Sequence, residues 1–340
     1  MDGKKILTVI LAIILIIPVG RKWYDFLAYR FFDIGFVSSS PLNFEKLSDT
    51  EIKIVGYNSD LDKDFKIPSK ILILPNIYTV TCIGGRAFYR CKNLTSIKIP
   101  NSVTSIGDWA FYGCSELTSI EIPENVTSIG HNTFNRCSSL SNVKIPMIVI
   151  SIRMDAFNRC ISLTSIKIPN SVKSIGYDAF YGCSSLTSIE ISNSLTSIKD
   201  ETFYGGNSLS SIDIPHNVTY IGEKAFYDCS NLTSIKIPYH VTRIKDQTFY
   251  GCSSLTNVEI PNTVSFIGNE VFYGCSSLTN IKIPYSVTYI GDRAFMRCQN
   301  LDVVIDNSWD KIGTGVDVFE GCKSVDYTKL PPSINDITRN

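Results

Sequence analysis

The feature that most constrains this chain is a segment of 23 residues that recurs in register along most of its length. A phenylalanine marks the same position of each unit, with a final spacing of 24: Phe88, Phe111, Phe134, Phe157, Phe180, Phe203, Phe226, Phe249, Phe272, Phe295 and Phe319. A fixed period of this length is typical of a solenoid, in which each unit cannot bury its apolar face alone. We therefore expect one elongated domain, although 340 residues would otherwise suggest two globular ones.

Each unit has the pattern of one short coil. In the unit that begins at Leu94, Ile97 and Ile99 alternate with polar residues, which predicts a short strand with one buried face. Pro100 ends the strand because proline has no N–H to donate. A second inward pair and a back made of short turns or 3₁₀ helix complete the coil: Val103, Ile106, Ala110, Phe111 and Cys114.

Two departures from the pattern are informative. The glycine that follows Ile106 in the pattern is replaced by Arg153, Lys199 and Lys245 in other units, so this position does not require a positive φ. The unit Leu186–Gly206 lacks the proline, the glycine and the cysteine of its neighbours. We expect it to be the softest joint of the stack.

Nine of the eleven cysteines occupy one column of the repeat: Cys91, Cys114, Cys137, Cys160, Cys183, Cys229, Cys252, Cys275 and Cys298. The favoured interpretation is a ladder of small, buried, free thiols. Disulfides between neighbouring rungs are the alternative, since stacked strands lie only ~5 Å apart. The spacings match no Cys/His metal motif, and no cofactor is expected.

The N-terminal segment, residues 1–37, is interpreted as a signal or membrane anchor. Residues 6–19 form an apolar run after two lysines, which fits the hydrophobic core of a signal peptide or a retained anchor. A buried N-terminal helix is the alternative. The run carries basic residues on both sides, so it does not define an orientation in the membrane.

Three further regions follow. Residues 38–70 are predicted to cap the open edge of the first coil, with strands near Glu51–Tyr57 and Asp64–Ile67. Residues 71–322 form the repeat region, and residues 323–340 read as a polar tail.

The pattern Leu-x-x-Ile-x-Ile-Pro-x-x-Val-Thr-x-Ile-Gly-x-x-Ala-Phe-x-x-Cys resembles the BspA-like subclass of leucine-rich repeats across about Ile71–Cys322. The resemblance implies a curved, right-handed solenoid of about ten repeats with a parallel sheet on its concave face. Proteins of this subclass are typically displayed on microbial cell surfaces and take part in adhesion to host or matrix proteins. The resemblance supplies no active-site motif.

A charged column occupies the solvent-facing strand position: Lys98, Glu121, Lys144, Lys167, Glu190, Asp213, Lys236, Glu259 and Lys282. Opposite charges on adjacent strands attract each other by ~0.2–1 kcal/mol. The column therefore predicts a self-neutralising ladder that fixes strand stacking. The alternative is a mixed-charge platform for a protein partner, with Lys98, Glu121, Lys236 and Glu259 as candidate contacts.

Aromatic columns supply the other candidate sites. The position before the second inward isoleucine is serine in five units and then becomes bulky, as Tyr220, Arg243, Phe266 and Tyr289, with Tyr239 and Tyr285 near it in sequence. Tyr, Phe and Arg suit binding hot spots, so this half is the candidate partner surface. A tyrosine column after the core phenylalanine, expected to be partly buried on the back, is broken by Asn135 and Asn158.

The chain balances 32 basic against 32 acidic residues, which argues against a nucleic-acid partner. It carries no P-loop, GxSxG or HExxH motif, and its three histidines fall in different columns. We therefore expect a non-enzymatic protein-binding or adhesion protein, secreted or at the cell surface, with membrane contact through its N-terminal segment. The alternatives are an intracellular or membrane-anchored interaction scaffold and a glycan-binding surface protein.

Overall fold

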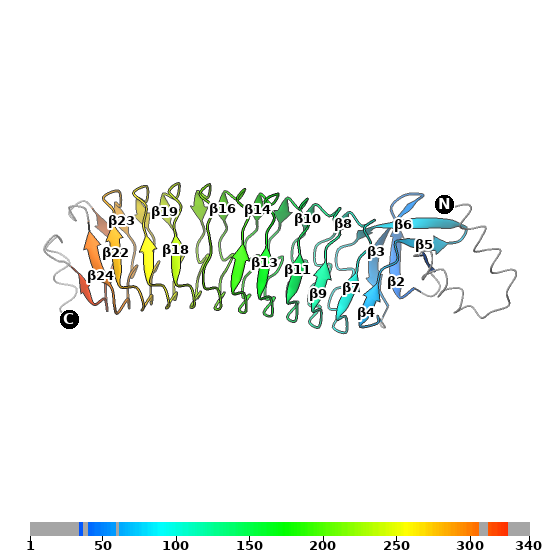
Figure 1. Ribbon diagram of the computed structural model, residues 1–340, viewed down its shortest axis with the longest axis horizontal. Coiled ribbons are helices and arrows are strands. Elements are labelled where there is room, and N and C mark those ends of the chain that lie inside the picture. Colours follow the sequence, from blue (N-terminus) through cyan, green and yellow to red (C-terminus); the bar gives the residue numbers. More distant parts are fainter. Residues whose placement is uncertain (1–33, 37–39, 59–60, 306–311, 326–340) are drawn as a thin grey trace.

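The protein is a β-solenoid of about ten stacked coils. The computed structural model describes residues 34–36, 40–58, 61–305 and 312–325, and every regular element in these ranges is a strand (Figure 1). Two strand columns run along the stack, as the alternation of apolar and polar residues predicts. The segment 6–19, interpreted as a signal or anchor, lies outside the described residues.

The first column holds the strands of the Leu-x-x-Ile-x-Ile segments. The column is divided into four hydrogen-bonded sheets, and within each sheet the strands pair in parallel, so that Ile97, for example, lies opposite Ile120. The column contains β4 (Asp64–Lys66), β7 (Ser96–Lys98), β9 (Ser119–Glu121), β11 (Asn142–Lys144), β13 (Ser165–Lys167), β15 (Ser188–Glu190), β18 (Ser234–Lys236), β20 (Asn257–Glu259), β22 (Asn280–Ile283), β24 (Asp302–Ile305) and β26 (Ser324–Val325).

The second column holds shorter strands, built on the second inward isoleucine. It contains β8 (Ser105–Ile106), β10 (Ser128–Ile129), β12 (Ser151–Ile152), β14 (Ser174–Ile175), β16 (Ser197–Ile198), β17 (Tyr220–Ile221), β19 (Arg243–Ile244), β21 (Phe266–Ile267), β23 (Tyr289–Ile290) and β25 (Gly313–Thr314). These strands pair in parallel within three groups, β10 to β14, β16 with β17, and β19 to β25, and β8 pairs with the N-terminal sheet. The residue before each isoleucine faces outward, and β25 has Thr314 in place of the isoleucine.

The N-terminal sheet lies against the first coils. It has the order β1 (Ile34–Phe36), β5 (Lys70–Ile73), β6 (Asn76–Ile83), β3 (Glu51–Tyr57) and β2 (Leu42–Lys46), and β6 also pairs with β8. The two strands predicted near residues 51–57 and 64–67 are confirmed as β3 and β4. β4 pairs in parallel with β7, so the first strand column begins within the predicted cap.

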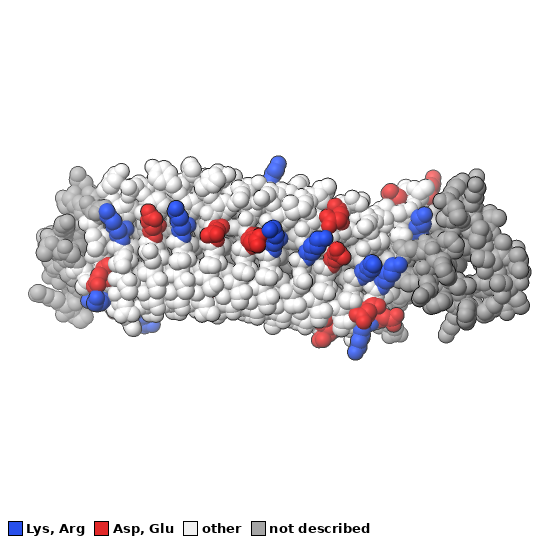
Figure 2. All heavy atoms as spheres, viewed as in Figure 1, with Lys and Arg blue, Asp and Glu red and all other residues white. Residues whose placement is uncertain are grey.

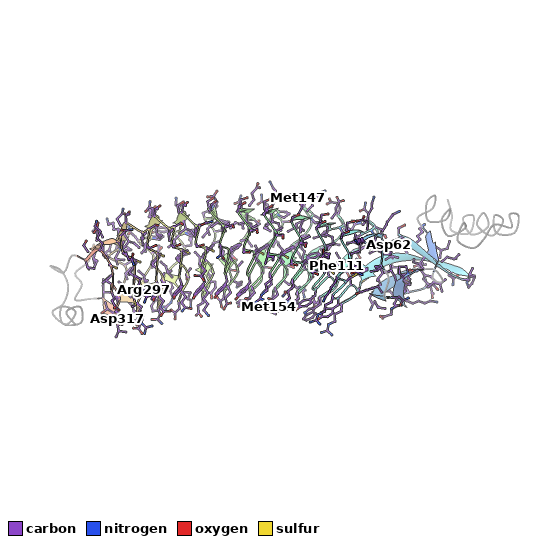
Figure 3. All side chains as sticks on the ribbon, turned by 90° about the horizontal axis from the view of Figure 1, so that it is seen from below. Asp62, Phe111, Met147, Met154, Arg297 and Asp317 are labelled. Atoms are coloured by element: carbon purple, nitrogen blue, oxygen red, sulfur yellow. The ribbon has the colours of Figure 1, made fainter. Side chains whose placement is uncertain are left out.

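The core is a ladder of phenylalanine rings, one from each coil. From Phe88 to Phe319 successive rings stack with centroids 5.2–5.7 Å apart. Phe111, Phe134 and Phe157 are fully buried, and Figure 3 shows Phe111 within the body of the stack. The prediction that each coil covers its neighbour's apolar face is confirmed.

The cysteine column beside these rings consists of free, buried thiols, so the disulfide alternative is wrong. From Cys114 to Cys298, each thiol of the column donates to the carbonyl of a core phenylalanine in the preceding coil; the Sγ of Cys183, for example, lies 3.2 Å from the oxygen of Phe157. Burial raises the pKa of Cys183 and of Cys229 to about 12. The ladder is therefore an uncharged part of the core.

The back of each coil is built from turns whose N–H groups alternate between two kinds of partner. The N–H of Tyr89 bonds to the oxygen of Arg86 in its own coil, whereas the N–H of Phe88 bonds to the oxygen of Ala110 in the next. The N–H of Phe111 belongs to the same peptide group as the oxygen of Ala110, and it donates to the oxygen of Thr133 in the following coil. Hydrogen-bonded columns of peptide groups thus run along the back of the stack.

These turns require two left-handed residues per coil, at the positions of Arg86 and Arg90. The glycine column of Gly107 is not among them, as the sequence indicates. Glycine serves there to let successive coils approach closely, because a Cβ on Gly107 would lie 2.5 Å from the nitrogen of Gly85.

Candidate functional site

The bulky residues of the second strand column stack on one another along the outside of the solenoid. The ring centroids of Phe266 and Tyr289 lie 5.2 Å apart at an interplanar angle of 13°. The guanidinium carbon of Arg243 lies 3.8 Å from the Phe266 centroid, in a cation–π contact. We call Arg243, Phe266 and Tyr289 the cation–aromatic stack; they come from the paired strands β19, β21 and β23.

Tyr220 lies one coil before this stack, on β17. Its hydroxyl donates to the Oδ1 atom of Asp200 over 2.8 Å. The ammonium groups of Lys199 and Lys245 lie 5.6 and 5.9 Å from its ring centroid. Partial burial, with the Asp200 carboxylate beside it, raises the pKa of Tyr220, so the phenol is neutral at physiological pH. Its orientation is fixed by these neighbours.

Tyr239 and Tyr285 occupy the turns between the two strand columns, two coils apart. Both are strongly exposed, at 66% and 64%. The Tyr239 ring meets the His240 ring edge to face at 6.2 Å, and the Nδ1 atom of His240 lies 3.0 Å from the oxygen of His216. Arg243, Phe266 and Tyr289 are therefore stacked in one row, whereas Tyr239 and Tyr285 lie at separate points of the same C-terminal half of the solenoid.

The charged column forms a row across the middle of the face seen in Figure 2. Lys98, Glu121, Lys236 and Glu259 are all exposed, and Lys236 stands directly opposite Glu259 in the strand register. Glu121 lies 3.6 Å from Lys144, and Lys167 lies 2.7 Å from Glu190. These contacts support the ladder interpretation, although each exposed pair is worth at most ~1 kcal/mol.

Sequence reasoning missed two surface features. Met147, Ile148 and Ile150 are exposed apolar residues at positions where other coils carry polar ones, and Met147 projects from an edge of the stack in Figure 3. A cavity of about 420 Å³ opens on the back, where Asn135 and Asn158 interrupt the tyrosine column. The sequence shows that asparagines interrupt the tyrosine column. The depth of the resulting cavity, however, depends on how the flanking tyrosine rings stack.

Within the described ranges, no group of histidine, cysteine and acidic side chains is arranged to hold a metal ion. The same part of the chain contains no helix long and apolar enough to cross a membrane.

Comparison with known proteins now defines the family. The BspA type leucine rich repeat region (6 copies) matches residues 68–160, 150–254 and 242–340. The chain belongs to this family. The match covers every coil described above, and it agrees with the parallel strand columns and the stacked core.

Two solved structures are similar to this chain over most of its length. A leucine rich cell surface protein from Faecalibacterium prausnitzii is 28% identical, with a TM-score of 0.57, over 88% of this chain and 96% of that one. The pneumococcal vaccine antigen PcpA is 17% identical, with a TM-score of 0.56, over 87% and 93% of the two chains, and shares the fold. A search of the curated proteins gives no match.

Proposed function

We propose that this BspA type protein acts without catalysis, as a surface-displayed adhesin that binds a protein through the cation–aromatic stack and Tyr220. The observation that carries the proposal is the stack itself. Arg243, Phe266 and Tyr289 are outward-facing side chains held in fixed positions by contacts with one another. Aromatic and arginine side chains of this kind supply most of the binding energy in protein interfaces.

Rigidity supports this assignment. Residues that are already ordered lose little conformational entropy on binding, which otherwise costs ~0.5–1.5 kcal/mol for each immobilised side chain. The exposed tyrosines at 239 and 285 extend the aromatic surface toward the turns. The mixed charges of Lys236 and Glu259 lie on strands of the same coils and provide a polar surround.

The test replaces Tyr220, Phe266 and Tyr289 by serine, the residue that five other coils carry at this position. The triple variant should lose binding to a panel of immobilised extracellular-matrix proteins while its circular dichroism and melting temperature stay close to the wild type. A matched control replaces Tyr227 and Tyr250 on the back by serine and should bind normally. Unchanged binding by the triple variant would refute the assignment.

Surface display is supported by the relative from Faecalibacterium prausnitzii, which is described as a cell surface protein. Protease treatment of intact cells should digest the repeat region, and mass spectrometry of the mature N-terminus should show whether residues 6–19 are cleaved. Protection of the repeat region in intact cells, with digestion after lysis, would instead favour an intracellular interaction scaffold.

A further inference from the structure

The back of the solenoid carries a ladder of tyrosine rings with a gap in it. Tyr89 and Tyr112 stack at 5.0 Å, and the rings from Tyr181 to Tyr273 stack at 4.5–4.6 Å. All of these tyrosines are half-buried, as the sequence predicts. Between Tyr112 and Tyr181, two successive rungs are Asn135 and Asn158, and the cavity of about 420 Å³ lies there.

The dimensions of the gap follow from the repeat. Tyr112 and Tyr181 lie three coils apart, and coils in a parallel sheet are spaced by ~4.8 Å, which places the two rungs about 14 Å apart. Two flat rings fit between them, one for each missing tyrosine. The volume is in the range of small-molecule binding sites, about 300–1,000 Å³.

The walls of the cavity are polar and carry both signs of charge. Asn132, Asn135 and Asn158 contribute amides, Asp155 and Asp178 contribute carboxylates, and Arg86, Arg136 and Arg159 contribute guanidinium groups. Part of this set is already organised: Asn135 donates to Asn132 over 2.8 Å, and Asn158 donates to Asp155 over 2.6 Å. The lining thus offers hydrogen-bond donors and acceptors around a flat gap.

The coil that forms one side of the gap holds unsatisfied polar atoms. Among the residues that the structure describes, three buried side-chain atoms lack a hydrogen-bond partner: His131 Nδ1, Thr133 Oγ1 and Asn135 Oδ1. All three fall within five consecutive residues, and Asn135 itself lines the cavity. A buried polar group without a partner costs ~1–3 kcal/mol. Because buried polar atoms in proteins nearly always have hydrogen-bond partners, three unsatisfied atoms in one coil indicate that a ligand could supply the missing bonds there.

We propose that this cavity binds a neutral carbohydrate, with one or two pyranose rings stacked between Tyr112 and Tyr181 and their hydroxyls bonded to the surrounding amides, carboxylates and guanidinium groups. A pyranose ring has C–H groups on its faces, which pack on aromatic rings, and hydroxyls around its rim, which both donate and accept. An inserted aromatic side chain would satisfy the two tyrosines but would leave the polar wall desolvated without partners. An anionic ligand would be attracted by the three arginines but repelled by Asp155 and Asp178, so the mixed charges of the wall favour a ligand without net charge.

The decisive variant fills the gap. Asn135→Tyr with Asn158→Tyr restores the residue found at this position in seven other coils, and neither asparagine has a positive φ that would oppose the change. The single variant Asn158→Tyr fills one rung and guards against misfolding of the double variant. Both variants should melt at or above the melting temperature of the wild type.

The assay is saturation-transfer NMR with the methyl pyranosides of glucose, galactose, mannose, fucose and N-acetylglucosamine, and with lactose and cellobiose, at millimolar concentration. We expect transfer to at least one sugar with the wild type, a weaker signal with Asn158→Tyr and none with the double variant. Trp109, which lines the cavity, should change its fluorescence on sugar binding.

Two results would overturn the proposal: no transfer to any of these sugars with the wild type, or equal transfer with the filled double variant. Binding of free tyrosine amide in place of the sugars would assign the gap to aromatic side chains instead. The variant Tyr220→Ser, Phe266→Ser, Tyr289→Ser should bind sugar normally, because the carbohydrate site is independent of the protein-binding surface.

Discussion

Replacing Gly206 by cysteine should stabilise the protein, because Gly206 is the one interruption in the cysteine column between Cys91 and Cys298. In the neighbouring coils the thiols of Cys183 and Cys229 donate to Phe157 and Phe203. By the same register, a thiol at position 206 would donate to the oxygen of Phe180. Gly206 does not adopt a positive φ, so a side chain is compatible with its backbone.

The size of the effect can be estimated from the surroundings. A Cβ on Gly206 would lie 3.5 Å from the Sγ atom of Cys229, an ordinary contact, and 3.1 Å from the oxygen of Phe203, which must shift slightly. Restricting the unfolded chain contributes ~0.4–1 kcal/mol, and burying a group of methylene size contributes ~0.8 kcal/mol. After the adjustment at Phe203, we expect a net gain of about 1 kcal/mol.

Urea denaturation and thermal melting, both under reducing conditions, measure this gain; a rise of about 2–4 °C in melting temperature is expected. Hydrogen exchange should also slow at amides between Cys183 and Leu209, in the unit predicted to be the softest joint. The control is Gly205→Cys, one residue away, where φ is +67° and a side chain should destabilise. A Gly206→Cys protein no more stable than the wild type would show that the thiol column does not stabilise the stack.

Three other predictions follow from the core and the back. Phe157→Ala should lower the free energy of unfolding by ~3–5 kcal/mol in urea titrations, because its ring is fully buried between two others; a loss below ~1 kcal/mol would contradict the ladder. Iodoacetamide should label the partly exposed Cys82 and Cys322 of the native protein before Cys252, whose pKa burial raises, and mass spectrometry of the peptides gives the order. Burial, with nearby carboxylates, raises the pKa of Asp178 from 3.8 to about 6, so the folded protein binds this proton more tightly than the unfolded chain and stability is lost as pH rises through this window. Asp178→Asn should therefore add ~1–2 kcal/mol near neutral pH or above and little near pH 4, and equal effects at both pH values would contradict this.

The strands and the core could be predicted from the sequence because both depend on local alternation that repeats in register. Ile97 and Ile99 point inward for the same reason as their counterparts in every coil. The first strand column lacks one strand that the pattern predicts. Residues 211–213, which follow the divergent unit Leu186–Gly206, form no strand, so that β15 is followed in this column by β18. The substitutions at Ser192 and Gly206 precede this break.

The conformation of the back could not be predicted from local propensity. The first left-handed position holds residues as different as Arg86, Asp178 and Glu201 and no glycine in the described coils, whereas the second holds glycine in some coils, such as Gly113, and arginine or aspartate in others, so no single residue type marks either position. Hydrogen bonds to the next coil impose these dihedral angles. Of the candidate sites, the alignment of Arg243, Phe266 and Tyr289 could be predicted from their 23-residue spacing. The cavity could not, because its size depends on how the neighbouring tyrosine rings stack.

The columns of peptide groups on the back all point the same way along the solenoid, whereas columns beside the strands point the opposite way, as in the bonds from the N–H of Gly107 to the oxygen of Ile83 and from the N–H of Thr118 to the oxygen of Thr95. Every N–H in the back columns points toward the C-terminal coil and every carbonyl toward the N-terminal one, as in the step from Phe88 to Ala110 and on from Phe111 to Thr133. Within the back columns, peptide dipoles of ~3.5 D therefore add, with their positive pole toward the C-terminal end, the reverse of an α-helix, and the columns beside the strands oppose them. A second copy could continue the back columns only in a head-to-tail arrangement.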